Sequence, residues 1–247
     1  GNEAESNDWD GIGLYSSENC VIHGNTVKNN TIFGIWLDSS NNNIIYHNNF
    51  LQNFQVSSAT SSNIWDNNWE GNYWSDYNGE DLLGGPYRNL TYSDGIGDTS
   101  YSIDVNNTDN YPLKGQFSSF DIMQEEKTYY ITTVSNNTIS DFHLDFGQIS
   151  FHVADLNETT GFCRISIPTA LLNGPYNVTV NGGEALIFRE LSISNDTTTY
   201  LYFTYPPTTS QVLIVPEFLS VFWLFITLSS LVFIMRRPKI RNRQYTG

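Results

Sequence analysis

The sequence predicts an all-β chain: the end of a right-handed parallel β-helix, then an antiparallel immunoglobulin-like β-sandwich, then one transmembrane helix. Three observations carry this prediction: a 23-residue repeat at the start, short alternating strands between turn sequences in the middle, and a long uncharged apolar run near the end. We expect rungs and cap over 1–117, the sandwich over 118–210, a linker over 211–217, the span over 218–235 and a cytoplasmic basic tail over 236–247.

The composition narrows the class of protein before any motif is considered. The 247 residues include 26 acidic and 11 basic side chains, which gives a net charge of −15, and 15% of the residues are aromatic. Such acidity argues against a nucleic-acid partner, which requires clustered Lys and Arg. Two cysteines exclude a disulfide scaffold, and the aromatic and β-branched content excludes a fully disordered chain.

The N-terminal repeat aligns Asp10–Asn30 with Phe33–Asn53, and 9 of these 21 positions are identical. Short strands at this period are typical of the rungs of a parallel β-helix. Stacked rungs lie about 4.8 Å apart, so Asn25 and Asn48 are predicted to form an amide ladder. The chain starts inside the repeat without a signal peptide, so we expect a fragment or processed form with further rungs before Gly1.

Aromatic residues crowd the segment that follows the repeat, residues 54–117. One interpretation is a cap that covers the last rung of the β-helix. The other is a platform on which sugar rings stack, and the two are compatible. The candidate ligand-binding residues are Trp65, Trp69, Tyr73, Trp74 and Tyr77.

Alternating strands separated by turns predict the sandwich. They cover residues 127–134, 148–153, 162–167, 176–180 and 198–205, and Pro206 with Pro207 is expected to begin a short stiff stalk.

The apolar run 218–235 carries no charge and is long enough, with part of the preceding stretch, to cross a bilayer. Five of the 11 basic residues follow it within the last twelve positions. The positive-inside rule then places the tail in the cytoplasm and residues 1–215 outside a cell membrane, in a single-pass topology. Seven candidate glycosylation sites lie on the outer side: Asn29, Asn89, Asn106, Asn136, Asn157, Asn177 and Asn195.

The motifs Asn43–Phe50, Asn72–Tyr77, Asp94–Asp98 and Asp109–Leu113 resemble the end of the NosD-type β-helix repeat proteins of archaeal cell surfaces. The resemblance covers roughly residues 10–117. It implies a right-handed parallel β-helix with repeats of the carbohydrate-binding/sugar-hydrolase type. It also implies a link to copper, because the bacterial namesake is connected with copper supply.

A second resemblance concerns the C-terminal part. Pro216, Glu217 and Phe218, followed by the apolar run and a pair of arginines, are similar to the PEF-type sorting signal of archaea. In that class a sortase-like membrane enzyme removes the span, so cleavage after this motif is an open alternative to a permanent anchor.

Metal sites are considered at two places. Asp94 and Asp98 flank a loop similar to a calcium loop, although two of its expected oxygen ligands are missing. His23 and His47 lie on neighbouring rungs and are the candidate copper ligands, although a copper site requires more convergent ligands. We expect no cofactor, and calcium and copper stay open as alternatives. An interdomain disulfide between Cys20 and Cys163 also stays open.

These observations favour a noncatalytic, membrane-anchored cell-surface protein in surface architecture, adhesion or glycan binding. The expected partners are the membrane and glycans or other cell-envelope components. One alternative is a polysaccharide lyase or hydrolase, which requires two suitably placed carboxylates, and no catalytic pair can be chosen from spacing. The second alternative is a NosD-like periplasmic copper-binding protein.

Overall fold

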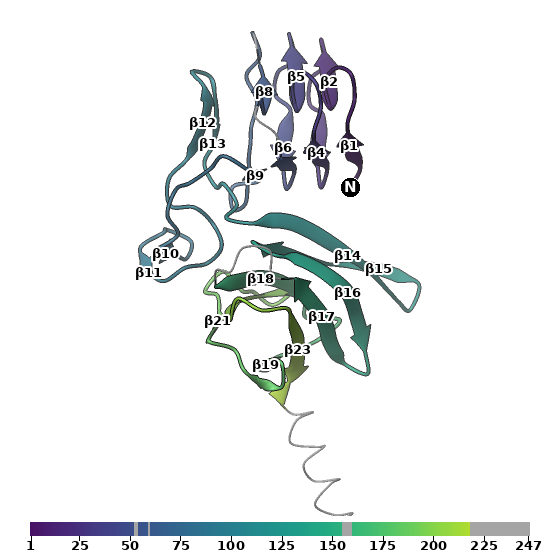
Figure 1. Ribbon diagram of the computed structural model, residues 1–247, viewed down its shortest axis with the longest axis vertical. Helices are drawn as coiled ribbons and strands as arrows, with labels where there is room; N and C mark the ends of the chain where they lie inside the picture. The colour runs from purple at the N-terminus through teal and green to yellow at the C-terminus, as the bar shows by residue number, and fades with distance from the viewer. Residues whose placement is uncertain (52–53, 59, 155–159, 218–247) are drawn as a thin grey trace, which may run out of the picture.

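The computed structural model describes residues 1–51, 54–58, 60–154 and 160–217. All secondary-structure elements in the described residues are β-strands, so the prediction of an all-β chain is confirmed for this part of the chain. No helix in the described ranges is long and apolar enough to cross a membrane. The predicted span 218–235 and the tail 236–247 lie outside the described residues. Figure 1 shows the repeat region at the top and two larger sheets below it.

The repeat region forms a parallel β-solenoid of about three turns (Figure 1). Its strands pair in the predicted 23-residue register, with Ile12 beside Ile35 and Val21 beside Ile44. The solenoid has three parallel sheets. These are β1 (Glu3–Glu5), β4 (Thr26–Lys28), β7 (Asn49–Leu51) and β9 (Tyr73–Trp74); β2 (Ile12–Tyr15), β5 (Ile35–Asp38) and β8 (Val56–Ser57); and β3 (Val21–His23) with β6 (Ile44–Tyr46).

Side chains in the short strands of the solenoid alternate between its interior and its surface, and the interior ones pack into one core. Val27, Ile35, Leu37, Ile45 and Phe50 point inward and are fully buried in one cluster. The corners between strands turn through left-handed backbone, which polar residues such as Asn tolerate best. Equivalent corners share this conformation on successive rungs, for example at Asn19 and Asn42 with φ of 58° and 57°.

Asparagine ladders run along the solenoid and confirm the predicted stacking of Asn25 on Asn48. Oδ1 of Asn48 accepts from Nδ2 of Asn25 at 2.9 Å, and Oδ1 of Asn72 accepts from Nδ2 of Asn48 at 3.0 Å. The row ends at Asp109, whose Oδ2 accepts from the backbone N of Asn72 at 2.7 Å. The ladder therefore continues from the solenoid into the segment that covers its end.

The segment 54–117, here called the cap segment, closes the last rung with aromatic rings. Trp74 stacks on Phe50 at 4.5 Å and on Tyr101 at 4.4 Å between ring centroids. Both buried indoles have acceptors: Nε1 of Trp65 donates to Asn107, and Nε1 of Trp74 donates to Asp109. The short strands of this segment after β9 are β10 (Leu83–Gly84), β11 (Leu90–Thr91), β12 (Tyr101–Asp104) and β13 (Asn107–Asp109).

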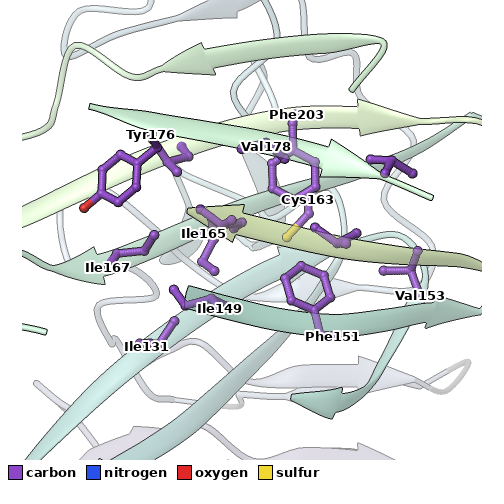
Figure 2. Packing of buried hydrophobic residues seen from close by; sticks show 14 of the residues in the cluster. Ile131, Ile149, Phe151, Val153, Cys163, Ile165, Ile167, Tyr176, Val178 and Phe203 are labelled. Atoms are coloured by element: carbon purple, nitrogen blue, oxygen red, sulfur yellow. The ribbon is translucent and has the colours of Figure 1, made fainter. Parts of the chain in front are cut away.

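Two five-stranded antiparallel sheets follow, here called the sheet pair, and they share one hydrophobic core. Figure 2 shows that core, with Phe151, Phe203 and Ile165 among its side chains. The first sheet has the order β14 (Gln116–Gln124), β15 (Lys127–Ser135), β18 (Gly161–Pro168), β22 (Thr198–Tyr205) and β21 (Ile187–Glu190). The second has the order β16 (Thr138–Asp145), β17 (Gln148–Ala154), β23 (Ser210–Pro216), β19 (Tyr176–Val180) and β20 (Gly183–Glu184).

The end of the sheet pair differs from the sequence prediction. Residues 211–217 were expected to form a linker, but β23 occupies nearly all of this range and lies between β17 and β19. The apolar stretch Val212–Val215 alternates between buried and half-buried positions, which is the pattern of a strand. In the immunoglobulin order CFG the last strand lies at an edge. The position of β23 therefore differs from the immunoglobulin order, and the structure of the described residues does not show the predicted immunoglobulin-like sandwich.

The two cysteines are both free thiols, so the alternative of an interdomain disulfide is not found. Cys20 is exposed on the solenoid and Cys163 is buried in the core of the sheet pair.

Candidate functional site

A cleft of about 520 Å³ opens between the cap segment and the first sheet of the sheet pair. Trp69 from the cap segment and Tyr130 from β15 both line it, and their side chains are 53% and 57% exposed. Both rings therefore offer solvent-exposed aromatic surface within one cleft. Hydroxyl and amide side chains complete the wall, among them Asn67, Thr132, Ser166, Ser192 and Asn195.

A buried ionic cluster lies at the cleft and joins the two parts of the chain. Nε of Arg164, in β18, donates to Oε1 of Glu70 at 2.7 Å, and Nε2 of His47 lies 2.7 Å from Oε2 of Glu70. The guanidinium also donates to the backbone carbonyl of Asp94 at 2.9 Å and lies over the ring of Tyr200. Each partner is held by further contacts, so the cluster is rigid.

Electrostatics keep Glu70 ionised. Burial raises the pKa of its carboxyl, but the charge of Arg164 and the hydrogen bond with His47 outweigh burial and hold the pKa at about 2. Arg164 and Glu70 offset each other's charge, and Glu70 is the single carboxylate among the described residues that line the cleft. The cleft therefore presents aromatic and uncharged polar groups around a neutralised ion pair.

A second set of contacts fixes the solenoid to the sheet pair beside this cluster. The side chain of Asn49 accepts from the backbone N of Phe117 at 2.7 Å and donates to its carbonyl at 2.9 Å. The imidazole of His47 stacks on the ring of Phe117 at 4.0 Å between centroids. The position of Trp69 relative to Tyr130 is thus set by contacts on both sides of the junction.

The predicted ligand-binding aromatics separate into three groups. Trp65 and Trp74 are fully buried and belong to the solenoid core, so neither offers a face to a sugar. Tyr73 and Tyr77 are half-buried against neighbouring clusters, and the hydroxyl of Tyr77 donates to the carbonyl of Thr99 at 2.6 Å. Trp69 alone of the five lines the cleft.

The candidate copper ligands are held by other partners. His23 stacks on Tyr46 in the next rung, in the register the repeat predicts, and His47 contacts Glu70. Across the part of the chain that the structure describes, no three His, Cys, Asp or Glu side chains are grouped so as to hold a metal ion.

The candidate calcium loop is held by hydrogen bonds to backbone amides. Asp98 accepts from the backbone N of Leu82 at 2.8 Å, and Asp94 accepts from the backbone N of Ile96 at 3.1 Å. Asp81 folds back onto this loop, and its two oxygens accept from the backbone N of Asp94 and of Gly95. Burial raises the pKa of Asp81 to about 7, with the charges of Asp94 and Asp98 adding to the effect.

The candidate glycosylation sites lie mostly at the surface. Asn136 is half-buried, and its side chain bonds to the backbone of Phe162 and of Thr160. Asn157 lies outside the described residues. The exposed sites are Asn29, Asn89, Asn106, Asn177 and Asn195.

Sequence reasoning missed Arg164, Glu70 and Tyr130. Arg164 had one recognisable signal, because it is a lone charged residue within the otherwise uncharged and mostly apolar strand 162–167. A charge in such a strand requires a buried partner. Nothing in the sequence indicated that the partner would be Glu70.

The solenoid geometry agrees with the comparison of the sequence with protein families. Residues 1–79 match the family model described as periplasmic copper-binding protein (NosD). The matched range covers β1 to β9 and so fits a NosD-type parallel β-helix, and it ends before the sheet pair. Comparison with curated proteins finds no significant match, and comparison with solved structures finds none either.

Proposed function

We propose that this chain is a noncatalytic, membrane-anchored surface protein that binds glycans in the cleft between the cap segment and the sheet pair. The observation that carries the proposal is the pair of exposed aromatic side chains, Trp69 and Tyr130, on two walls of one cleft. An aromatic face packs well against the C–H face of a pyranose ring. Amide and hydroxyl groups next to it bind the sugar hydroxyls.

The charge of the cleft favours neutral sugars. The acidity of the whole chain repels anionic polysaccharides, and Arg164 is already paired with Glu70. The volume of about 520 Å³ falls within the range of small-ligand sites. We therefore expect neutral oligosaccharides of the cell envelope or of neighbouring cells as ligands.

A glycosidase or lyase is less well supported. Glycoside hydrolysis requires a carboxyl group that is protonated in the working pH range, usually together with a second carboxylate. Glu70 has a pKa of about 2 and is held by Arg164 and His47. It is thus unsuited to donate a proton to a leaving group.

Anchorage of the chain rests on the sequence of residues 218–235 and on the basic tail. The resemblance to archaeal cell-surface proteins supports the same orientation, with the described residues outside the cell. In a second form of this proposal, a membrane enzyme cleaves the chain at the PEF-type signal and removes the span.

The name of the matched family favours a second candidate, copper binding by the solenoid. Its test is copper retention by the purified chain and by a variant with His23→Ala and His47→Ala. Stoichiometric copper in the parent chain and loss in the variant would support it.

A glycan array with the full chain in detergent, followed by calorimetric titration of the neutral oligosaccharide that binds best, tests the main proposal. Trp69→Ala and Tyr130→Ala are each expected to weaken binding at least tenfold. Trp9→Ala is the matched control, because Trp9 is 72% exposed on the first rung, away from the cleft. Equal binding by all three variants would exclude the cleft, and an array without bound glycans would reject the function.

A further inference from the structure

The hairpin between β16 and β17 ends in an unusual turn. Its two central residues, Phe146 and Gly147, have φ of 49° and 73°. Positive φ at both positions is the pattern of a type I′ turn, which favours Asn or Asp followed by Gly. A bulky aromatic residue in the left-handed region is uncommon and strained.

The side chain of Phe146 receives no packing in return for this strain. It is 97% exposed. Positions that break a local rule without a structural gain are candidates for a functional role. The location of this side chain within the sheet pair indicates which role.

The strand register places Phe146 at the end of the sheet where the described chain stops. Ile149 of β17 pairs with Ile214 of β23 in an antiparallel ladder. Continuing that ladder by three residues puts Phe146 level with Glu217, the residue before the predicted span. Figure 1 shows the turn between β16 and β17 and the end of β23 on the same lower side of the molecule.

No stalk separates the sheet pair from the predicted span. Pro216 is still paired with Tyr176, and the backbone N of Glu217 donates to the carbonyl of Pro175 at 2.8 Å. The uncharged apolar run begins at the next residue, Phe218. If 218–235 crosses a bilayer, its surface lies at the level of the β16–β17 turn.

We propose that Phe146 inserts into the interface of a zwitterionic lipid bilayer and holds the sheet pair against the membrane. This inference rests on the anchorage proposed above. The carboxylates of Asp145 and Glu217 flank the site and disfavour anionic headgroups, so the partner is a zwitterionic surface. An aromatic contact beside the span restricts tilting of the ectodomain and thus the direction in which the cleft faces.

The test uses the full chain in phosphatidylcholine nanodiscs. Cys20→Ser removes the exposed thiol, and Cys163 is buried. Phe146→Cys is then labelled with the environment-sensitive dye NBD. Val105→Cys is the matched control, because Val105 is a 95% exposed apolar residue between β12 and β13, next to the solenoid.

The expected result is a blue-shifted emission of the dye at position 146 and at least twofold stronger quenching by brominated lipid than at position 105. Replacing part of the phosphatidylcholine with anionic lipid should reduce this difference. Equal emission and quenching at both positions, in nanodiscs that contain the chain, would overturn the insertion of Phe146 but not the anchorage of the chain. A chain that does not co-purify with nanodiscs would overturn both the anchorage and the insertion.

Discussion

The guanidinium of Arg164 and the carboxylate of Glu70 are 94 residues apart in the sequence and 2.7 Å apart in the structure. Their contact joins the sheet pair to the cap segment at the wall of the cleft. A buried ion pair adds little net stability, but removal of one partner leaves the other charge buried and unpaired.

Arg164→Met should therefore lower the free energy of unfolding by about 3 kcal/mol, as measured by urea denaturation. Adding Glu70→Gln to this variant should cost less than the sum of the two single changes, since the charges act together. Arg189→Met is the control, because Arg189 is exposed and its guanidinium lies over the ring of Tyr92, so it should change stability by at most about 1 kcal/mol. Additive losses would show that the pair is not coupled.

The stability of the fold should be greatest near pH 4. Burial raises the pKa of Asp81 and of Asp109 to about 7, so the folded chain binds more protons than the unfolded chain above pH 4. The free energy of unfolding then falls as the pH rises from about 4 to 7. Glu70 acts oppositely: its pKa is lowered to about 2, so its contribution is lost as the pH falls below about 4.5.

Urea denaturation between pH 3 and pH 8 measures this profile. Each of the two carboxyls contributes about 1.4 kcal/mol per pH unit up to about pH 7, so a loss of about 5 kcal/mol is expected from pH 5 to pH 8. Asp109→Asn should flatten the upper limb, because one of the two raised carboxyls no longer titrates. A profile that rises steadily from pH 5 to pH 8 would contradict the assignment.

The asparagine ladder should contribute strongly at its centre. Asn48 is fully buried, accepts from Asn25, and donates to Asn72 and to the carbonyl of Ile22. Asn48→Ala should cost about 3 kcal/mol in urea denaturation, because it leaves several buried groups unpaired. Asn78→Ala, at an exposed site, is the matched control. Similar losses for both variants would mean that the ladder adds no stability of its own.

Phe146→Asn should stabilise the protein in solution. Asn followed by Gly is the preferred pair for a type I′ turn, and the left-handed conformation costs a bulky residue about 1 kcal/mol. The midpoint of thermal unfolding of the detergent-solubilised chain should therefore rise by a few degrees. A lower midpoint would show that the aromatic ring supports the fold.

The solenoid could be predicted from the sequence because the period of its sequence repeat equals the register in which its strands pair. Identical residues 23 positions apart, such as Asn25 and Asn48, become neighbours along one ladder, so sequence spacing is a direct measure of contact. The role of Trp65 and Trp74 was less certain, because an indole suits either a cap or a sugar platform. The structure decides between these roles, because both indoles are buried. Their burial depends on contacts with residues 101–109, which follow no repeat.

The cleft could not be predicted, since its walls meet through tertiary contacts. Trp69 and Tyr130 lie on separate parts of the chain, and no spacing rule connects the loop between β8 and β9 with a strand of a later sheet. The strand β23 could not be predicted for a different reason: its apolar residues directly precede the longer apolar run 218–235, so hydropathy alone does not separate the strand from the predicted span. Burial along β23 alternates with a period of two, but Val212–Val215 is apolar throughout, so the sequence does not show this alternation.

The central position of β23 has a consequence for the order of folding. Ribosomes deliver the chain from its N-terminus, and the solenoid rungs pair with neighbours only 20 to 24 residues away. In the second sheet, β17 and β19 are complete early but contact each other only through Ser210–Pro216. That sheet closes when nearly all of the described chain has been made, so the sheet pair matures last. Its apolar faces stay open until just before the predicted span emerges, which makes this interval the time of greatest need for a chaperone.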